Sequence, residues 1–169
     1  LAQIGQLYET PLSIVESVVS SNTQRQKDMA ARVVAAAGGD IKGKRVGVLG
    51  IAFKPNTDDI REAPSLVIIP ELQALGAEIA AHDPVAMDHA RKALAGVEWC
   101  EDPYEVAKGA DVLVIVTEWN EYRALQLDRI EELMKTPCLV DLRNIYKLPE
   151  MEETGFHYVS IGRPEIKPG

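Results

Sequence analysis

Two cations in one short loop, Lys54 and Arg61, are the residues best suited to hold an anion. Both follow Gly50, which ends an apolar segment, and ammonium and guanidinium groups suit phosphate oxygens. The alternative is a charged loop whose residues pair with one another in water, with Asp58 and Asp59 holding Arg61 in place. The loop is therefore a candidate phosphate contact, and its own spacing does not decide between the two interpretations.

The same loop is not a standard dinucleotide-binding fingerprint. Such a site uses G-x-G-x-x-G, which lets a pyrophosphate approach backbone N–H groups at a helix N-terminus. Here Gly47 and Gly50 are spaced G-x-x-G, Phe53 stands where a third glycine would, and a long insert delays the next helix. A tight pyrophosphate cradle is therefore not expected.

Arg143 is another cation that directly follows an apolar segment. Its fork-shaped guanidinium suits a phosphate or a ribose hydroxyl, and the alternative is an ion pair with Asp141. Asp83 also ends an apolar segment, where a dinucleotide-binding domain has its ribose carboxylate. Because Asp83-Pro84 also makes a good turn, both interpretations of this aspartate stay open.

A third polar turn follows the most apolar segment, 112–116. In it Glu118 stands close to Trp119 and Tyr122, a combination that can recognise a sugar or a base. Packing explains the two aromatic residues equally well. The coincidence of three polar turns after three apolar segments is more informative than any one of them.

The elements that must position these turns alternate in type. Strands are predicted at 45–50, 77–82, 97–100, 111–117, 138–141 and 156–161, helices at 64–75, 85–95, 104–108 and 124–135, and a surface loop at 149–154. Such alternation predicts an α/β fold of the Rossmann-like, doubly wound kind, with a mainly parallel sheet of about six strands. Ligands of these sheets bind beyond the carboxyl ends of the strands, where the three polar turns fall.

One long helix is predicted over residues 10–37, with Thr10 as its cap and Pro11 in its first turn. It would be about 40 Å long, too long for a small domain to cover alone. Midway its apolar stripe turns polar at Asn22 and Gln26, one turn apart. The simpler interpretation is a helix that links two domains or packs on a partner chain. A polar contact to a ligand is the alternative.

Composition narrows the class of protein. The formal charge of −8 argues against a nucleic-acid or anionic-membrane surface, and no apolar run is long enough to span a bilayer. Cys100 and Cys138 are expected to be buried hydrophobes, with a disulfide and a catalytic thiol as the alternatives. Three histidines without a spaced Cys/His set give no support for a zinc site. Leu1 is not a start methionine, so we expect the chain to be a piece of something longer. We also expect the protein to be cytoplasmic.

Several segments together resemble one enzyme family. The first loop contains the run Gly50-Ile51-Ala52-Phe53-Lys54-Pro55-Asn56-Thr57-Asp58-Asp59-Ile60-Arg61-Glu62-Ala63-Pro64-Ser65. This run is similar, almost letter for letter, to a signature of the C-terminal part of the UDP-glucose/GDP-mannose dehydrogenases. It is most similar to the signature of the bacterial UDP-glucose 6-dehydrogenases. The segments 22–26, 81–84, 117–122 and 141–144 match the family in order and spacing.

The resemblance implies oxidation of a sugar C6 alcohol to the acid in two NAD-dependent steps, through a cysteine-bound intermediate. It further implies that Phe53 and Lys54 contact the UDP-sugar substrate, that Arg143 contacts its UDP part, and that Arg61 contacts NAD held mainly by another domain. Residues 1–39 would form the central helix region, which makes a homodimer. Residues 40–169 would form the UDP-binding domain.

The family's nucleophilic motif, Gly-Gly-Ser-Cys-Phe-Pro-Lys-Asp, does not occur in this sequence, and neither does its NAD fingerprint. Neither Cys100 nor Cys138 has the matching context, so no catalytic residue is assigned and the chain by itself is expected to be inactive. The alternatives are a non-catalytic nucleotide-binding or dimerisation module, and the same domain of a GDP-mannose or UDP-N-acetylmannosamine dehydrogenase.

Overall fold

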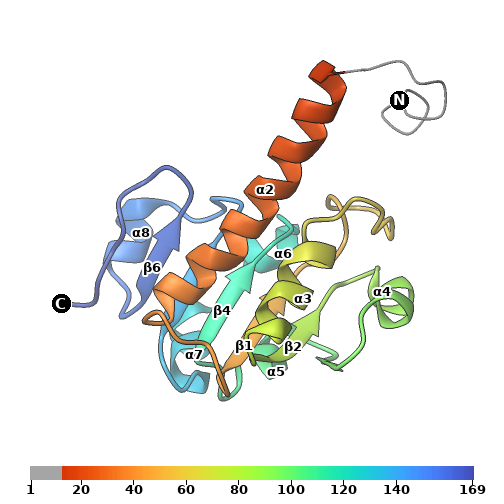
Figure 1. The fold of residues 1–169 in the computed structure, drawn as a ribbon. Helices are drawn as coiled ribbons and strands as arrows, with labels where there is room; N and C mark the ends of the chain where they lie inside the picture. The colour runs from red at the N-terminus through yellow and green to blue at the C-terminus, as the bar shows by residue number, and fades with distance from the viewer. Residues whose placement is uncertain (1–12) are drawn as a thin grey trace.

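The computed structural model describes residues 13–169, which form a parallel sheet with helices on both faces and one long leading helix (Figure 1). The strands are β1 (Arg45–Leu49), β2 (Glu78–His82), β3 (Val97–Trp99), β4 (Val112–Ile115), β5 (Cys138–Asp141) and β6 (His157–Ser160). Their order in the sheet is β3-β2-β1-β4-β5-β6, and every neighbouring pair is parallel. This confirms the predicted doubly wound, Rossmann-like fold.

The helices that follow the long helix are short. They are α3 (Ser65–Ala74), α4 (Met87–Ala93), α5 (Pro103–Ala107), α6 (Asn120–Arg123), α7 (Leu127–Leu133) and α8 (Leu148–Glu152). The helix predicted at 124–135 is confirmed with shorter bounds as α7, whose Ile130 is buried, whereas α6, anchored by the buried Tyr122, was not predicted. The loop predicted at 149–154 was wrong, since Pro149 occupies the first turn of α8 and Met151 is buried beneath it.

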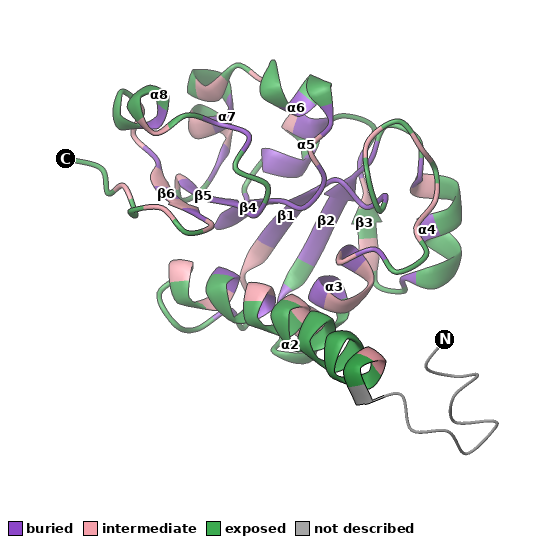
Figure 2. Cartoon of the chain, turned by 90° about the horizontal axis from the view of Figure 1, so that it is seen from above, coloured by how far each residue is buried: buried purple, intermediate pink, exposed green. Residues whose placement is uncertain are grey.

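The sheet separates two hydrophobic layers because successive strand residues point to opposite faces. On β4, Val112 and Val114 face the layer beneath α3, whereas Leu113 and Ile115 face the layer beneath α5 and α7. Figure 2, which looks along the sheet, shows α2 and α3 on one side and α5, α6, α7 and α8 on the other. Burial on both faces explains why the strands of this sheet are almost continuously apolar.

The long helix α2 (Ser13–Ala36) is buried at one end and exposed at the other. Its C-terminal half packs on α3 and the sheet, with Ala30 and Val33 buried. Its N-terminal half projects past the carboxyl ends of the strands (Figure 1), and there Ile14 is 79% exposed and Val18 53% exposed. The predicted cap Thr10 and the first-turn Pro11 lie outside the described residues.

Both cysteines are free and buried, which confirms their prediction as core residues. The Cys138 sulfur lies 3.7 Å from Nδ1 of His157, a contact that could suggest an activated thiol. Burial, however, raises the pKa of Cys138 to about 11, and burial also raises the pKa of Cys100. Because the thiolate is the nucleophilic form, neither side chain has the protonation state of a catalytic cysteine near neutral pH.

Candidate functional site

The order of the strands reverses between β1 and β4, so the loops after these two strands flank the switch point where such folds bind ligands. Gly50 ends β1 with φ at +92°, and a Cβ there would lie 2.5 Å from Cβ of Thr117 on the neighbouring loop. A Cβ on Gly47 would lie 2.8 Å from side-chain atoms of Leu113 and Val106. The two glycines of the G-x-x-G run therefore allow β1 to pack closely against β4, α5 and the loop after β4.

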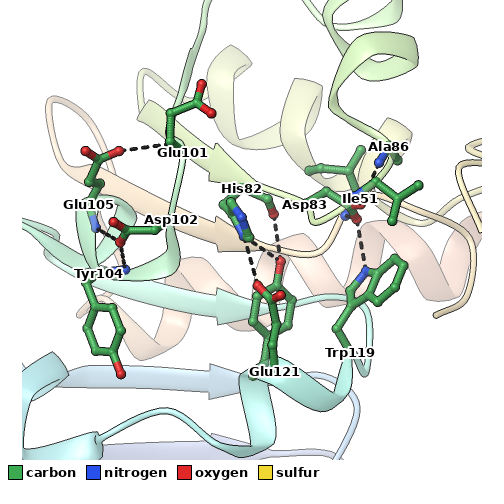
Figure 3. Close-up of polar contacts among 12 residues, drawn as sticks. Ile51, His82, Asp83, Ala86, Glu101, Asp102, Tyr104, Glu105, Trp119 and Glu121 are labelled. Atoms are coloured by element: carbon green, nitrogen blue, oxygen red, sulfur yellow. Dashed lines mark hydrogen bonds and ion pairs between the residues drawn. The ribbon is translucent and has the colours of Figure 1, made fainter. Parts of the chain in front are cut away.

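A buried carboxylate connects the loops around the switch point. Asp83, directly after β2, is fully buried, and its two oxygens accept hydrogen bonds from three separate segments (Figure 3). The donors are Ile51 N (2.7 Å), Ala52 N (2.9 Å), Val85 N (3.0 Å), Ala86 N (2.8 Å) and Trp119 Nε1 (3.1 Å). The carboxylate has no acceptor capacity left for a ribose, so Asp83 is the turn residue of the two alternatives.

The aromatic residues of the third polar turn are packing residues. Trp119 is 7% exposed and Tyr122 is fully buried. The Tyr122 hydroxyl donates to the carbonyl oxygen of His82 and lies 3.0 Å from His82 Nδ1. Burial lowers the pKa of His82, which favours the neutral imidazole, and Nδ1 is then the donor to Tyr122 because the hydroxyl proton is already used. The Glu121 carboxylate lies 3.6 Å from the same ring nitrogen (Figure 3).

Arg143 does not form the expected alternative ion pair with Asp141. Its Nε and one terminal nitrogen donate to the two oxygens of Glu118 at 2.5 and 2.7 Å, which is a bidentate pair between the loops after β4 and β5. Burial acts to raise the pKa of Glu118, but the hydrogen bonds from Arg143 and the backbone outweigh it and lower that pKa. Glu118 therefore stays ionised and fixes the plane of the guanidinium.

Asp141 is instead a second buried carboxylate that holds a loop, as Asp83 does. It accepts hydrogen bonds from the backbone N–H groups of Arg143 and Ile145, at 3.0 and 2.8 Å. It also accepts the hydroxyl of Tyr158 on β6 at 2.7 Å, and burial raises the pKa of that tyrosine, which keeps its proton in place. The turn that carries Arg143 is thus fixed to the sheet.

Phe53 and Arg143 line one cleft of about 500 Å³ between α2 and the strand-end loops. The other lining residues are Asn22, Arg25, Gln26, Met29, Glu62, Pro64 and Leu142. Phe53 is 49% exposed even though its backbone N–H is bonded to the carbonyl oxygen of Asp59 at 2.8 Å. The cleft therefore brings together two of the four residues that the sequence singled out.

The other two residues lie elsewhere on the same loop. Arg61 lines a second cleft of about 460 Å³ toward α4, beside Asp58, Asp59 and His89. Its guanidinium is bonded to the Asp59 carboxylate at 2.8 and 2.9 Å, and this hydrogen bonding lowers the pKa of Asp59 to about 2. Lys54 is exposed and lines neither cleft. The loop from Phe53 to Arg61 thus separates two clefts.

Sequence reasoning missed two features of this site. It did not find Glu118 as the partner of Arg143, because the two residues lie on different loops. It also treated the α2 amides mainly as an interdomain or interchain seam, although the change of the helical stripe from apolar to polar was the available signal. Within residues 13–169 no cluster of metal-ligating side chains is found, and no helix of that part is long and apolar enough to cross a membrane.

The strand order, together with a cleft at the switch point walled by an arginine and an aromatic ring, defines a nucleotide-binding domain of Rossmann-like class. A model of the UDP-glucose/GDP-mannose dehydrogenase family, UDP binding domain, matches residues 47–148. The chain belongs to this family and corresponds to its C-terminal, UDP-binding part.

Similar proteins agree with this assignment. The chain is 50% identical over 165 residues to the UDP-glucose 6-dehydrogenase of Rhizobium meliloti, with 98% of this chain and 38% of that protein covered. A UDP-glucose dehydrogenase structure from Pyrobaculum islandicum superposes with a TM-score of 0.74 at 29% identity, over 95% of this chain and 34% of that one. A UDP-D-ManNAc dehydrogenase structure from Pyrococcus horikoshii gives a TM-score of 0.66 at 26% identity, over 83% and 31%. The chain thus spans about a third of the length of these relatives.

Replacing the central carboxylate tests its role. Asp83→Asn keeps the side-chain volume but puts an NH₂ group where an oxygen accepts N–H donors, so we expect the free energy of unfolding to fall by about 2 kcal/mol or more. Asp88→Asn, an exposed residue in the first turn of α4, removes the same charge and should cost less than about 1 kcal/mol. Urea unfolding of both variants measures this, and equal effects would contradict the role of Asp83.

Proposed function

We propose that the cleft between α2 and the strand-end loops binds the UDP part of a nucleotide sugar in an NAD-dependent UDP-glucose 6-dehydrogenase. The observation that carries the proposal is the meeting of Arg143 and Phe53 in one cleft at the switch point of a UDP binding domain. Arg143 would bind the diphosphate, and the half-exposed ring of Phe53 would cover an apolar part of the ligand.

The ion pair with Glu118 leaves Arg143 able to do this. A guanidinium has five N–H donors, and Glu118 accepts only two of them, the Nε–H and one N–H of a terminal nitrogen. The remaining donors can meet a phosphate on the other edge of the fork. Glu118 fixes the plane of the Arg143 guanidinium, and Asp141 fixes the backbone of Arg143. Little side-chain entropy is therefore lost when the ligand binds.

Lys54 would contact the same substrate from the rim of the cleft. Its exposed ammonium makes no ion pair within residues 13–169, in contrast to Arg61, which is paired with Asp59. Lysine acts as a mobile point charge, which suits a residue that closes onto a bound ligand. Arg61, on the far side of the loop, would contact NAD held mainly by a domain beyond these 169 residues.

The whole reaction would convert UDP-glucose and water to UDP-glucuronate while two NAD are reduced to NADH. The nucleophilic cysteine motif of the family does not occur in the sequence, and both cysteines present are buried. This chain alone would therefore bind substrate without turning it over. Cytoplasmic location is part of the proposal, since NAD and nucleotide sugars are supplied there.

We propose further that two copies of the chain associate through α2. Ile14 is 79% exposed, and Val18 and Val19 are 53% and 51% exposed along the projecting half of the helix. Apolar residues at this spacing form the kind of stripe that a second helix covers. We propose a second copy of this chain as the partner that covers the stripe, because the resemblance to the UDP-glucose/GDP-mannose dehydrogenases implies a dimer formed by the central helix.

Sedimentation velocity tests the association. Val18→Asp places a charge in the stripe and should shift the chain toward monomer, whereas Ser20→Asp, on the opposite side of α2, should leave the dimer intact. A wild-type chain that is monomeric at micromolar concentration would contradict the proposal.

Isothermal titration calorimetry with UDP, GDP and NAD tests the binding proposal. UDP should bind, Arg143→Ala should weaken it about tenfold or more, and Lys54→Ala should weaken it by a smaller factor, because each removes a charge-assisted contact. Arg129→Ala is the matched control, since Arg129 stacks on Tyr104 away from the cleft.

Other outcomes of the titration identify the alternatives. Preferential binding of GDP would favour a GDP-mannose dehydrogenase domain, and UDP-N-acetylmannosamine binding more tightly than UDP-glucose would favour that sugar. A folded chain that binds no nucleotide would contradict the proposal and favour a dimerisation module.

A further inference from the structure

The polar stretch of α2 lies on the same helical face as its buried stretch. Asn22, Arg25, Gln26 and Met29 follow the i, i+3, i+4, i+7 spacing of one face, and all four line the 500 Å³ cleft. One turn further along, Val33 is fully buried. The face therefore changes from apolar to polar where α2 passes the carboxyl edge of the sheet (Figure 1). At that edge it is directed at the cleft that also contains Arg143.

Arg25 differs from the other two cations of α2. Lys27 is paired with Glu71 of α3 at 3.9 Å, and Arg32 donates to the carbonyl oxygen of Ser160 at 3.3 Å. Among residues 13–169, Arg25 has neither an ion pair nor a hydrogen-bond partner for its guanidinium. Because arginine stays charged at every relevant pH, a full positive charge is present at this wall of the cleft.

The net charge of the residues around the cleft shows why binding a diphosphate there requires a second cation. The charge of Arg143 is already matched by Glu118, and Glu62 adds a carboxylate to the lining. Without Arg25 these groups would leave the cleft with a negative charge, which opposes a diphosphate. Arg25 is the one lining cation, within the part of the chain that the structure describes, whose charge no acidic side chain takes up.

We infer that Arg25 is a second ligand of the diphosphate and approaches it from the α2 wall while Arg143 approaches from the loop after β5. The inference rests on the proposed function, because it assigns a further residue to the same cleft. Asn22 and Gln26, one turn apart beside it, supply amide donors and acceptors to the neighbouring part of the nucleotide. The polar stretch of α2 therefore forms the side of the cleft that contacts the nucleotide.

Titration of the full chain with UDP, for the variants Arg25→Gln and Lys27→Gln, tests this assignment. Both variants remove one positive charge from exposed positions of the same helix, two residues apart. Arg25→Gln should weaken UDP about tenfold and flatten the dependence of affinity on salt, because one charge-assisted phosphate contact is lost. Lys27→Gln should change the affinity less than twofold. Arg25→Lys should keep part of the affinity, and thermal unfolding of each variant checks that it is folded.

The outcomes distinguish a failure of the role of Arg25 from a failure of the proposed UDP-binding function. Wild-type affinity in Arg25→Gln, or equal losses in Arg25→Gln and Lys27→Gln, would overturn the role of Arg25 while UDP binding by the wild type still supports the proposed function. A folded wild-type chain that binds no UDP would overturn both. If Arg25→Gln does not fold, Arg25→Lys decides, because it keeps the charge but loses the forked donor. A partial loss of UDP affinity without loss of stability then supports the contact, and wild-type affinity contradicts it.

Discussion

A buried carboxylate that accepts hydrogen bonds from several chain segments keeps those segments in one arrangement, because separating any of them leaves a desolvated charge without a partner. Asp83 has this role at the end of β2. It bonds the first residues of the loop after β1, the start of its own turn, and the indole of Trp119 in the loop after β4. The two loops that flank the switch point are therefore positioned by one side chain, whose oxygens are fully used in these hydrogen bonds.

Asp141 repeats this arrangement on the other side of the switch point, at the end of β5. It holds the turn of Arg143, and Glu118 then holds the guanidinium itself. The three cations of the strand-end loops that the sequence singled out thus differ in freedom. Arg143 and Arg61 are oriented by Glu118 and Asp59, whereas the exposed Lys54 has no ion pair within residues 13–169. A site assembled in this way pays most of its ordering cost during folding and little of it during binding.

Much of the fold could be predicted from the sequence, because apolar strands and short helices alternate with clear turn residues. The six parallel strands were found, since strands buried on both faces are apolar throughout. The short helices α6 and α8 were missed and α7 was predicted too long, because in each of them one buried residue, such as Met151, decides the structure and no periodicity develops.

The candidate site was predicted less completely for a physical reason. Sequence reasoning pairs charges that are close along the chain, and it was right for Asp59 and Arg61 but wrong for Asp141 and Arg143. The carboxyl ends of parallel strands bring distant loops together, so the true partner, Glu118, lies 25 residues from Arg143. The role of α2 was similarly hidden, since only the docked helix shows that its polar face meets the cleft.

In the proposed complex, the diphosphate of a nucleotide sugar lies between α2 and the loop after β5. A crystal structure of the chain in complex with UDP tests it most directly. We expect the diphosphate within hydrogen-bonding distance of the Arg143 and Arg25 guanidinium groups, with the ring of Phe53 beside the nucleotide. UDP bound instead in the cleft of Arg61 and His89, on the other side of the same loop, would contradict it.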